Sequence, residues 1–69
     1  MEDLQISLAA ARVNAKLTQE DVANKLHVSK RTIVNWEKGK VTPAFATVRM
    51  LSELYNIPIN NIFLPDKST

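Results

Sequence analysis

Basic and amide side chains recur at helical spacing in the segment KRTIVNWEK, residues 30–38. On a helix turning about 100° per residue, one arc of about 140° carries Lys30, Arg31, Val34, Asn35 and Lys38. Guanidinium, ammonium and amide groups donate hydrogen bonds to base edges and phosphate oxygens, and a valine can contact a thymine methyl. The pattern indicates recognition of hydrogen-bonding or anionic groups. A basic helix face without context is more often only solvated, so the surrounding elements must decide.

Catalytic and metal-binding chemistry has little support in the sequence. His27 is the only histidine and there is no cysteine, so a metal site or a paired general base lacks its other members. No Gly-rich phosphate loop and no nucleophile with a plausible base occur. We therefore expect a protein that is not an enzyme, with no catalytic residues, no metal, no cofactor and no small-molecule substrate.

Length indicates one small domain or a fragment of a larger protein, and the charges along the chain are unevenly distributed. The 69 residues carry a net charge of only +2, but five basic residues stand against the single acid Glu37 between Lys25 and Lys40. The N-terminus MEDLQ is unlike a signal peptide, and no apolar run approaches the roughly 18 residues of a membrane span. We expect a cytoplasmic protein without a membrane partner.

The elements that position these side chains are all predicted to be helices. Thr18 with Asp21 resembles a capping box, Ser29 is a suitable N-cap, and Gly39 suits a left-handed helix end. Thr42 could cap a helix whose first position is Pro43, and Asn56 could end it. The expected helices cover about residues 3–14, 19–26, 30–38, 43–55 and a short one that begins at Pro58 and carries Ile59, Ile62 and Phe63; residues 65–69 form a tail.

The segments TQEDVANKL, HVS, KRTIVNWEKGK and VTP together resemble the Cro/CI-type (XRE family) helix-turn-helix domain of phage repressors and related bacterial regulators. The resemblance covers about residues 8–64. Its most specific pieces are Thr18 with Gln19, then Ala23, Val28, Ile33 and the closing WEKG. It implies an all-α, compact five-helix lambda-repressor-like DNA-binding domain over residues 1–64, with the motif at about 18–38.

The resemblance also assigns DNA contacts by position. The base-reading positions correspond to Lys30, Arg31, Asn35 and Val34, and the phosphate-contacting positions to Thr18, Gln19, Ser29, Lys38 and Lys40. Several alternatives stay open. Arg31 and Lys30 could contact phosphate instead, Asn35 could fall short of the bases, and Val34 could be an ordinary surface residue. Thr18 could be only a cap, and the two lysines after Glu37 could be only solvated.

Family relatives further suggest a structural ion pair between Arg12 and Glu37, tying the first helix to the third, with two solvated charges as the alternative. Trp36 is expected to pack in the core or at the rim of the groove, with a stacking platform for nucleic-acid bases as the alternative. The family often has glycine where this chain has Lys16, His27 and Asn56. Without glycine, a positive φ carries a steric cost, which is larger for Lys than for Asn and His. These turns could therefore be slightly strained or differently shaped.

As a whole, the resemblance implies a sequence-specific transcriptional regulator, in particular a repressor, bound as a homodimer to a two-fold double-stranded DNA operator with half-sites about 34 Å apart. The expected dimer contact comprises Ile57, Ile59, Asn60, Asn61, Phe63 and Leu64. The alternative function is an antitoxin-like or anti-repressor protein-interaction module, in which this C-terminal segment would matter more than residues 30–38.

Overall fold

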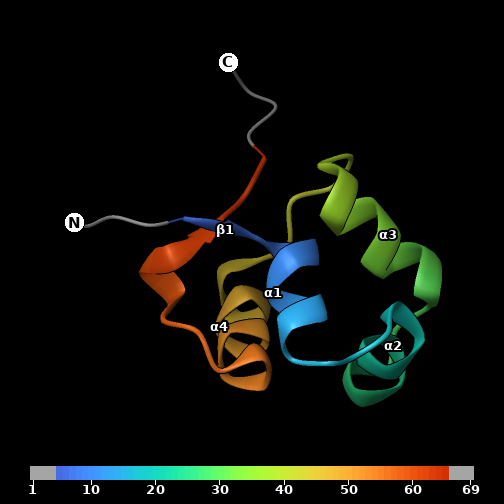
Figure 1. Cartoon of the computed structure of the whole chain (residues 1–69). Helices are drawn as coiled ribbons and strands as arrows, with labels where there is room; N and C mark the ends of the chain where they lie inside the picture. The colour runs from blue at the N-terminus through green and yellow to red at the C-terminus, as the bar shows by residue number, and fades with distance from the viewer. Residues whose placement is uncertain (1–4, 66–69) are drawn as a thin grey trace.

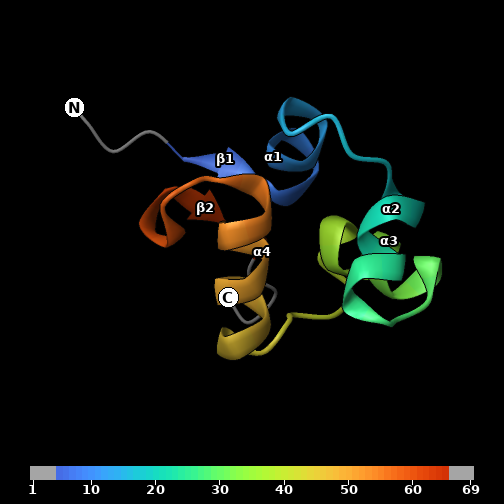
Figure 2. The ribbon, with the colours of Figure 1, turned by 90° about the horizontal axis from the view of Figure 1, so that it is seen from below.

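The fold, in a computed structural model that describes residues 5–65, consists mainly of helices. Residues 5–65 contain four α-helices, namely α1 (Leu8–Asn14), α2 (Gln19–Leu26), α3 (Lys30–Lys38) and α4 (Phe45–Tyr55), followed by one 3-10 turn, η1 (Ile59–Asn61). In Figures 1 and 2, α1 lies between α4 on one side and the α2–α3 pair on the other. The predicted helical class is confirmed, but the predicted count of five helices is wrong.

The predicted fifth helix is replaced by η1 and a strand. Ile62 and Phe63 form β2, which pairs in parallel with β1 (Ile6–Ser7), and the register places Ile6 opposite Ile62. Extended backbone suits the β-branched Ile62, whose side chain is buried. This ladder ties the two ends of the described chain together beside α1 (Figure 2).

Two helices also begin later than predicted. Ser7 caps α1, since its Oγ accepts a hydrogen bond from Ala10 N at 3.0 Å, so the helix starts at Leu8. The beginning of the predicted helix at residues 3–4 lies outside the described residues, as do residues 66–69 of the predicted tail. Helix α4 starts at Phe45 because Ala44 keeps an extended ψ of 157°, and Thr42 does not cap it.

The apolar sides of the four helices meet in one core. Its most completely buried side chains belong to Val22, Ile33 and Leu51, one each from α2, α3 and α4. Trp36 is buried with them, as expected. The core therefore holds α3, the helix with the basic outer face, against both α2 and the rest of the domain.

The turns that lack the family's glycines adopt left-handed backbone. Lys16, His27 and Asn56 have φ values of 64°, 59° and 56°. His27 and Asn56 directly follow α2 and α4, where such a residue closes the helix end. The chain thus has left-handed backbone at these three turns although its non-glycine residues adopt that conformation at a steric cost.

Candidate nucleic-acid interface

Helix α3 is fixed at both ends and along its inner side. Ser29 Oγ accepts a hydrogen bond from Thr32 N at 3.1 Å, and Gly39, with a φ of 79°, closes the C-terminus. Ile33 and Trp36 bury the inner side. Because α3 cannot rotate about its own axis without exposing these two side chains, its outer face has a fixed direction.

The outer face of α3 carries the four residues predicted to read bases. Lys30 and Arg31 are exposed, and Val34 and Asn35 are half-buried. Within residues 5–65, none of these four side chains forms a hydrogen bond or an ion pair. Lys30, Arg31 and Val34 together line a shallow hollow in the surface. The face therefore offers unpaired donors beside one apolar side chain, Val34, which is the chemistry that base edges require.

The N-terminus of α2 lies next to this face. Thr18, Gln19 and Lys30 line one surface hollow, together with Arg12, Leu17 and Glu20. Two predicted phosphate-contacting positions are thus close to Lys30. The first N–H groups of a helix and its dipole favour an anion at such a place.

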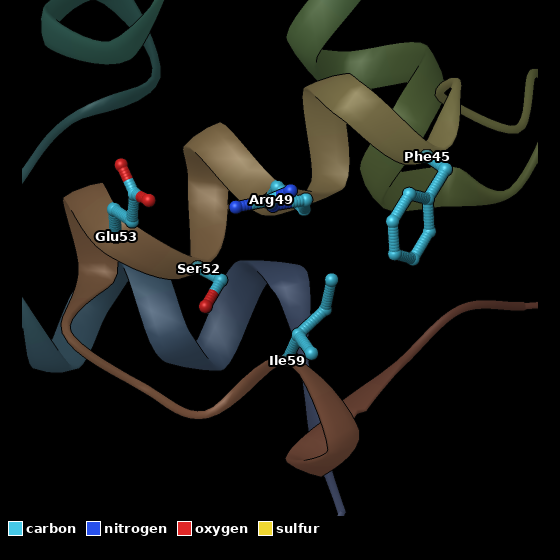
Figure 3. Close-up of a pocket in the computed structure, with 5 residues that line it drawn as sticks. All are labelled: Phe45, Arg49, Ser52, Glu53 and Ile59. Atoms are coloured by element: carbon cyan, nitrogen blue, oxygen red, sulfur yellow. The ribbon is translucent and has the colours of Figure 1, made fainter.

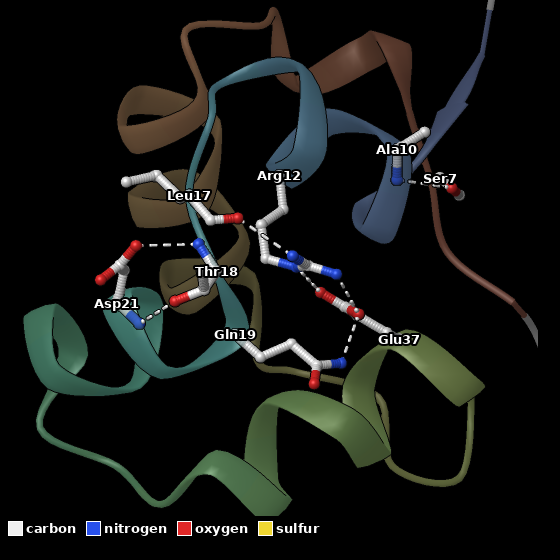
Figure 4. A network of polar contacts seen from close by, with 8 residues as sticks. All are labelled: Ser7, Ala10, Arg12, Leu17, Thr18, Gln19, Asp21 and Glu37. Atoms are coloured by element: carbon white, nitrogen blue, oxygen red, sulfur yellow. Dashed lines mark hydrogen bonds and ion pairs between the residues drawn. The ribbon is translucent and has the colours of Figure 1, made fainter.

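The predicted capping box of α2 is present (Figure 4). Thr18 Oγ1 accepts from Asp21 N, and Thr18 N donates to Asp21 Oδ2, both at 2.9 Å. Hydrogen bonding from Thr18 lowers the pKa of the Asp21 carboxyl below its ordinary value. Thr18 therefore acts as a cap in the free protein, and its hydroxyl hydrogen is still available to a phosphate.

A polar network behind the face joins α1, α2 and α3 (Figure 4). Arg12 Nε and Nη2 donate to Glu37 Oε2 and Oε1 at 2.7 and 3.3 Å, and Arg12 Nη1 donates to Leu17 O at 3.0 Å. The two side chains expose only 14% and 8% of their surface. Hydrogen bonding to Glu37 raises the pKa of the Arg12 guanidinium. The ion pair thus lies at the edge of the core and connects α1 to α3.

Gln19 has a contact that the sequence did not reveal. Its Nε2 donates to Glu37 Oε1 at 3.0 Å, so the amide is held by the same carboxylate as Arg12. No local pattern connects these residues, because they lie on two different helices. The second amide hydrogen and the backbone N–H of Gln19 are left to contact a phosphate.

The remaining predicted phosphate contacts lie at the two ends of α3. Ser29 precedes the helix and shares a hydrogen bond with Thr32 Oγ1 at 3.0 Å. Lys38 and Lys40 flank Gly39 and are both exposed. They extend the basic surface beyond the C-terminal end of α3.

The predicted dimer residues follow α4. Ile57, Ile59 and Leu64 are partly buried against the core, whereas Phe63 is 47% exposed. Asn60 is exposed and Asn61 is half-buried. Sequence reasoning missed two larger exposures on α4, namely Phe45 at 70% and Met50 at 49%. Their exposure depends on which side of α4 faces the core.

Metal binding and membrane insertion find no support in the described part of the chain. No group of three or more His, Cys, Asp or Glu residues is arranged to hold a metal ion within residues 5–65. Over the same residues, every helix is too short or too polar to span a bilayer.

Comparison with known proteins places the chain in a family. The helix-turn-helix family model matches residues 8–62, and the chain belongs to this family. It is 44% identical over 48 residues to the transcriptional repressor RstR of the cryptic phage CTXphi of Vibrio cholerae, covering 70% of this chain and 43% of RstR. The chain therefore matches less than half the length of that repressor.

Two further relatives differ in length and in named activity. An uncharacterised HTH-type transcriptional regulator of Methanocaldococcus jannaschii is 42% identical over 48 residues, which are 70% of this chain and 73% of the relative. The HTH-type transcriptional activator BcrR of Enterococcus faecalis is 33% identical over 55 residues, 80% of this chain and 27% of BcrR. No solved structure matches the chain significantly.

Proposed function

We propose that this chain is a sequence-specific DNA-binding transcriptional regulator that inserts α3 into the major groove. The observation that carries the proposal is the outer face of α3, where Lys30, Arg31 and Asn35 have no partner among the described residues and Val34 lies between them. Such a face, held by a packed helix pair, fits the groove in width and in hydrogen-bonding chemistry.

The basic and polar residues divide between two roles. Arg31 reads a guanine, Asn35 an adenine and Lys30 a guanine or a phosphate, with Val34 against a thymine methyl. Thr18, Gln19, Ser29, Lys38 and Lys40 contact the backbone on either side of the groove. Backbone contacts fix the register of the protein on DNA and do not themselves carry sequence information.

Repression is the regulatory outcome that we propose, supported by the likeness to the phage repressor RstR. The activator BcrR among the relatives makes activation the alternative. The proposed complex is a homodimer on a two-fold operator, with half-sites about 34 Å apart so that both α3 helices enter the same side of the duplex. The protein acts in the cytoplasm, where such an operator lies.

Selection of bound duplexes from a random DNA pool tests the proposal directly. We expect an enriched site with two-fold symmetry. On that site Arg31→Ala and Asn35→Ala should each weaken binding about 5- to 150-fold, corresponding to about 1–3 kcal/mol per base contact. Each substitution should also relax the base preference at one position of the half-site.

Lys25→Ala is the matched control, because Lys25 is exposed on α2 and lies outside the proposed contacts. It should bind the selected site like the unsubstituted protein, and circular dichroism should show all three variants folded. Recovery of no enriched sequence, or equal binding by Arg31→Ala, would contradict the proposal.

A further inference from the structure

Two arginines line surface hollows of the domain in different ways. Arg49, in the hollow beside α4 (Figure 3), forms no ion pair or side-chain hydrogen bond within residues 5–65. Arg12, in the hollow at the start of α2, donates two hydrogen bonds to Glu37 and one to Leu17 O. The polar lining is therefore held in place at the start of α2, where the proposed phosphate contact lies.

The first turn of α2 has backbone donors that the fold leaves unused. Asp21 N donates to Thr18 Oγ1 at 2.9 Å, and Val22 N donates to Thr18 O at 3.1 Å. The backbone N–H groups of Gln19 and Glu20 donate to no atom within residues 5–65. Both lie at the positive end of the helix dipole, where an anion is favoured. A phosphate here would meet donors whose direction is set by α2.

The side chain of Gln19 adds a third donor, and its direction is set by α3. Its Nε2 donates one hydrogen to Glu37 Oε1 at 3.0 Å (Figure 4). A primary amide has two hydrogens, so the other hydrogen of Nε2 remains free. Gln19 is half-buried, whereas Gln5, the other glutamine of the chain, is exposed. The free hydrogen of Gln19 therefore has a fixed direction before any DNA is bound.

Glu37 can hold this amide because its own carboxylate is held by Arg12. Arg12 Nη2 donates to Glu37 Oε1 at 3.3 Å and Nε donates to Oε2 at 2.7 Å, and the Glu37 side chain is only 8% exposed. The charge of Arg12 also balances that of Glu37, which would otherwise repel a phosphate bound nearby. The ion pair thus offers Gln19 a fixed acceptor and has no net charge.

We infer that Glu37 is a positioning residue for DNA binding, which orients the Gln19 amide toward a phosphate without contacting the duplex itself. The inference rests on the proposed function, because that phosphate belongs to the proposed DNA complex. Ordering a flexible side chain on binding weakens affinity, so an amide ordered beforehand should strengthen binding about 2- to 12-fold. Since Glu37 lies on α3, the same hydrogen bond fixes this backbone contact relative to the base-reading face.

Two double variants separate this hydrogen bond from the ion pair. Arg12→Met with Glu37→Gln and Arg12→Met with Glu37→Met have the same net charge, and both lack the ion pair. The first keeps an oxygen that can accept from Gln19, and the second has none. The first should bind the selected duplex about 2- to 12-fold more tightly than the second. The slope of log K against log salt concentration should be the same for both, since no charge differs between them.

An uncharged methylphosphonate, placed at one phosphate at a time, locates the effect on the DNA. The phosphate bound by Gln19 is the one whose replacement weakens binding by the unsubstituted protein but not by Gln19→Ala. On a duplex modified at that phosphate, the two double variants should bind equally. A difference that persisted there would overturn the inference, because it would arise from the stability of the fold and not from the Gln19 contact. Equal binding of the two variants to the unmodified duplex would also overturn it.

The order of the Gln19 side chain can be measured without any substitution. NMR relaxation of the two glutamine side-chain amides should show Gln19 Nε2 rigid and Gln5 Nε2 mobile in the protein without DNA. Equal mobility of the two amides would overturn the inference even if the double variants failed to fold. Failure of the unsubstituted protein to bind any duplex would contradict the proposed function together with this inference. Equal binding by the two double variants, alongside a normal selected site, would contradict only the role of Glu37.

Discussion

The carboxylate of Glu37 on α3 accepts hydrogen bonds from Arg12 on α1 and from Gln19 on α2, with Arg12 Nε only 2.7 Å away. One acid thus fixes the positions of both helices that flank the proposed recognition helix. The charge of Arg12 balances that of Glu37, so neither is buried alone.

Glu37→Ala should lower the free energy of unfolding by about 3 kcal/mol, because it leaves a partly buried guanidinium and an amide without their acceptor. Urea denaturation measures the loss. Arg12→Ala should cost a similar amount. The double variant should cost clearly less than the sum of the two, since each single substitution leaves an unpaired charge. Strictly additive losses would show that the pair is not coupled.

The left-handed turn after α2 should be improved by the glycine that the family often has there. His27 has a φ of 59°, which an L-residue adopts at a steric cost. His27→Gly should raise the free energy of unfolding by about 0.5 to 1 kcal/mol. By contrast, Lys25→Gly, which lies within α2 itself, should lower the free energy of unfolding by about 1 kcal/mol. Thermal unfolding of the two variants compares them. A lower midpoint for His27→Gly would mean that the histidine side chain makes a stabilising contact.

The helix caps illustrate which features of the fold the sequence could predict. The caps Thr18 with Asp21, Ser29, Gly39 and Asn56 depend on neighbours within a few residues, and the structure has all of them. The pairing of Ile6 with Ile62 and the hydrogen bond from Gln19 to Glu37 join residues far apart in the chain. Local periodicity carries no information about such contacts. It led to a helix at Ile62 and Phe63 where the structure has a strand.

For the candidate site, too, the sequence could predict local features but not those that depend on distant partners. Helical spacing indicated which side of α3 would be exposed, since Ile33 and Trp36 determine the buried side. Whether Arg31 contacts a base or a phosphate depends on DNA that the chain does not contain, so that assignment stays a prediction. The exposure of Phe45 depends on which side of α4 faces the core, where Val48, Leu51 and Tyr55 are buried.

Any substitution of Gly39 should destabilise the protein for two separate reasons. Its φ is 79°, and a Cβ added there would lie 2.7 Å from Pro65 Cβ. Gly39→Ala should therefore lower the free energy of unfolding by about 1–2 kcal/mol or more. Adding Pro65→Gly should restore the share of the free energy of unfolding that was lost to the close contact. The share lost to the unfavourable φ should remain lost. Equal stability of the single and double variants would assign the whole loss to backbone strain.

Tyr55 should make the protein sensitive to alkali. Burial, with a smaller contribution from the charge of Glu37, raises the pKa of its phenol from 10.0 to about 12. The unfolded chain therefore ionises first, so the stabilisation is complete below pH 10 and is lost as the pH rises from 10 to 12. Urea denaturation across this range should show a steeper fall for the unsubstituted protein than for Tyr55→Phe. Parallel curves would contradict the shifted pKa.

The ionic-strength dependence of binding should separate backbone contacts from base contacts. Each neutralised phosphate contributes about −0.9 to the slope of log K against log salt concentration, because binding releases condensed counterions. Lys38→Ala and Lys40→Ala should each make the slope shallower by about one unit, on selected and on scrambled duplexes alike. Loss of Asn35 should leave the slope unchanged and weaken only the selected duplex, since its amide carries no charge. Lys25→Ala should behave like the unsubstituted protein in both assays. A slope that none of the lysine substitutions alters would mean that the C-terminal end of α3 stays in solvent when DNA is bound.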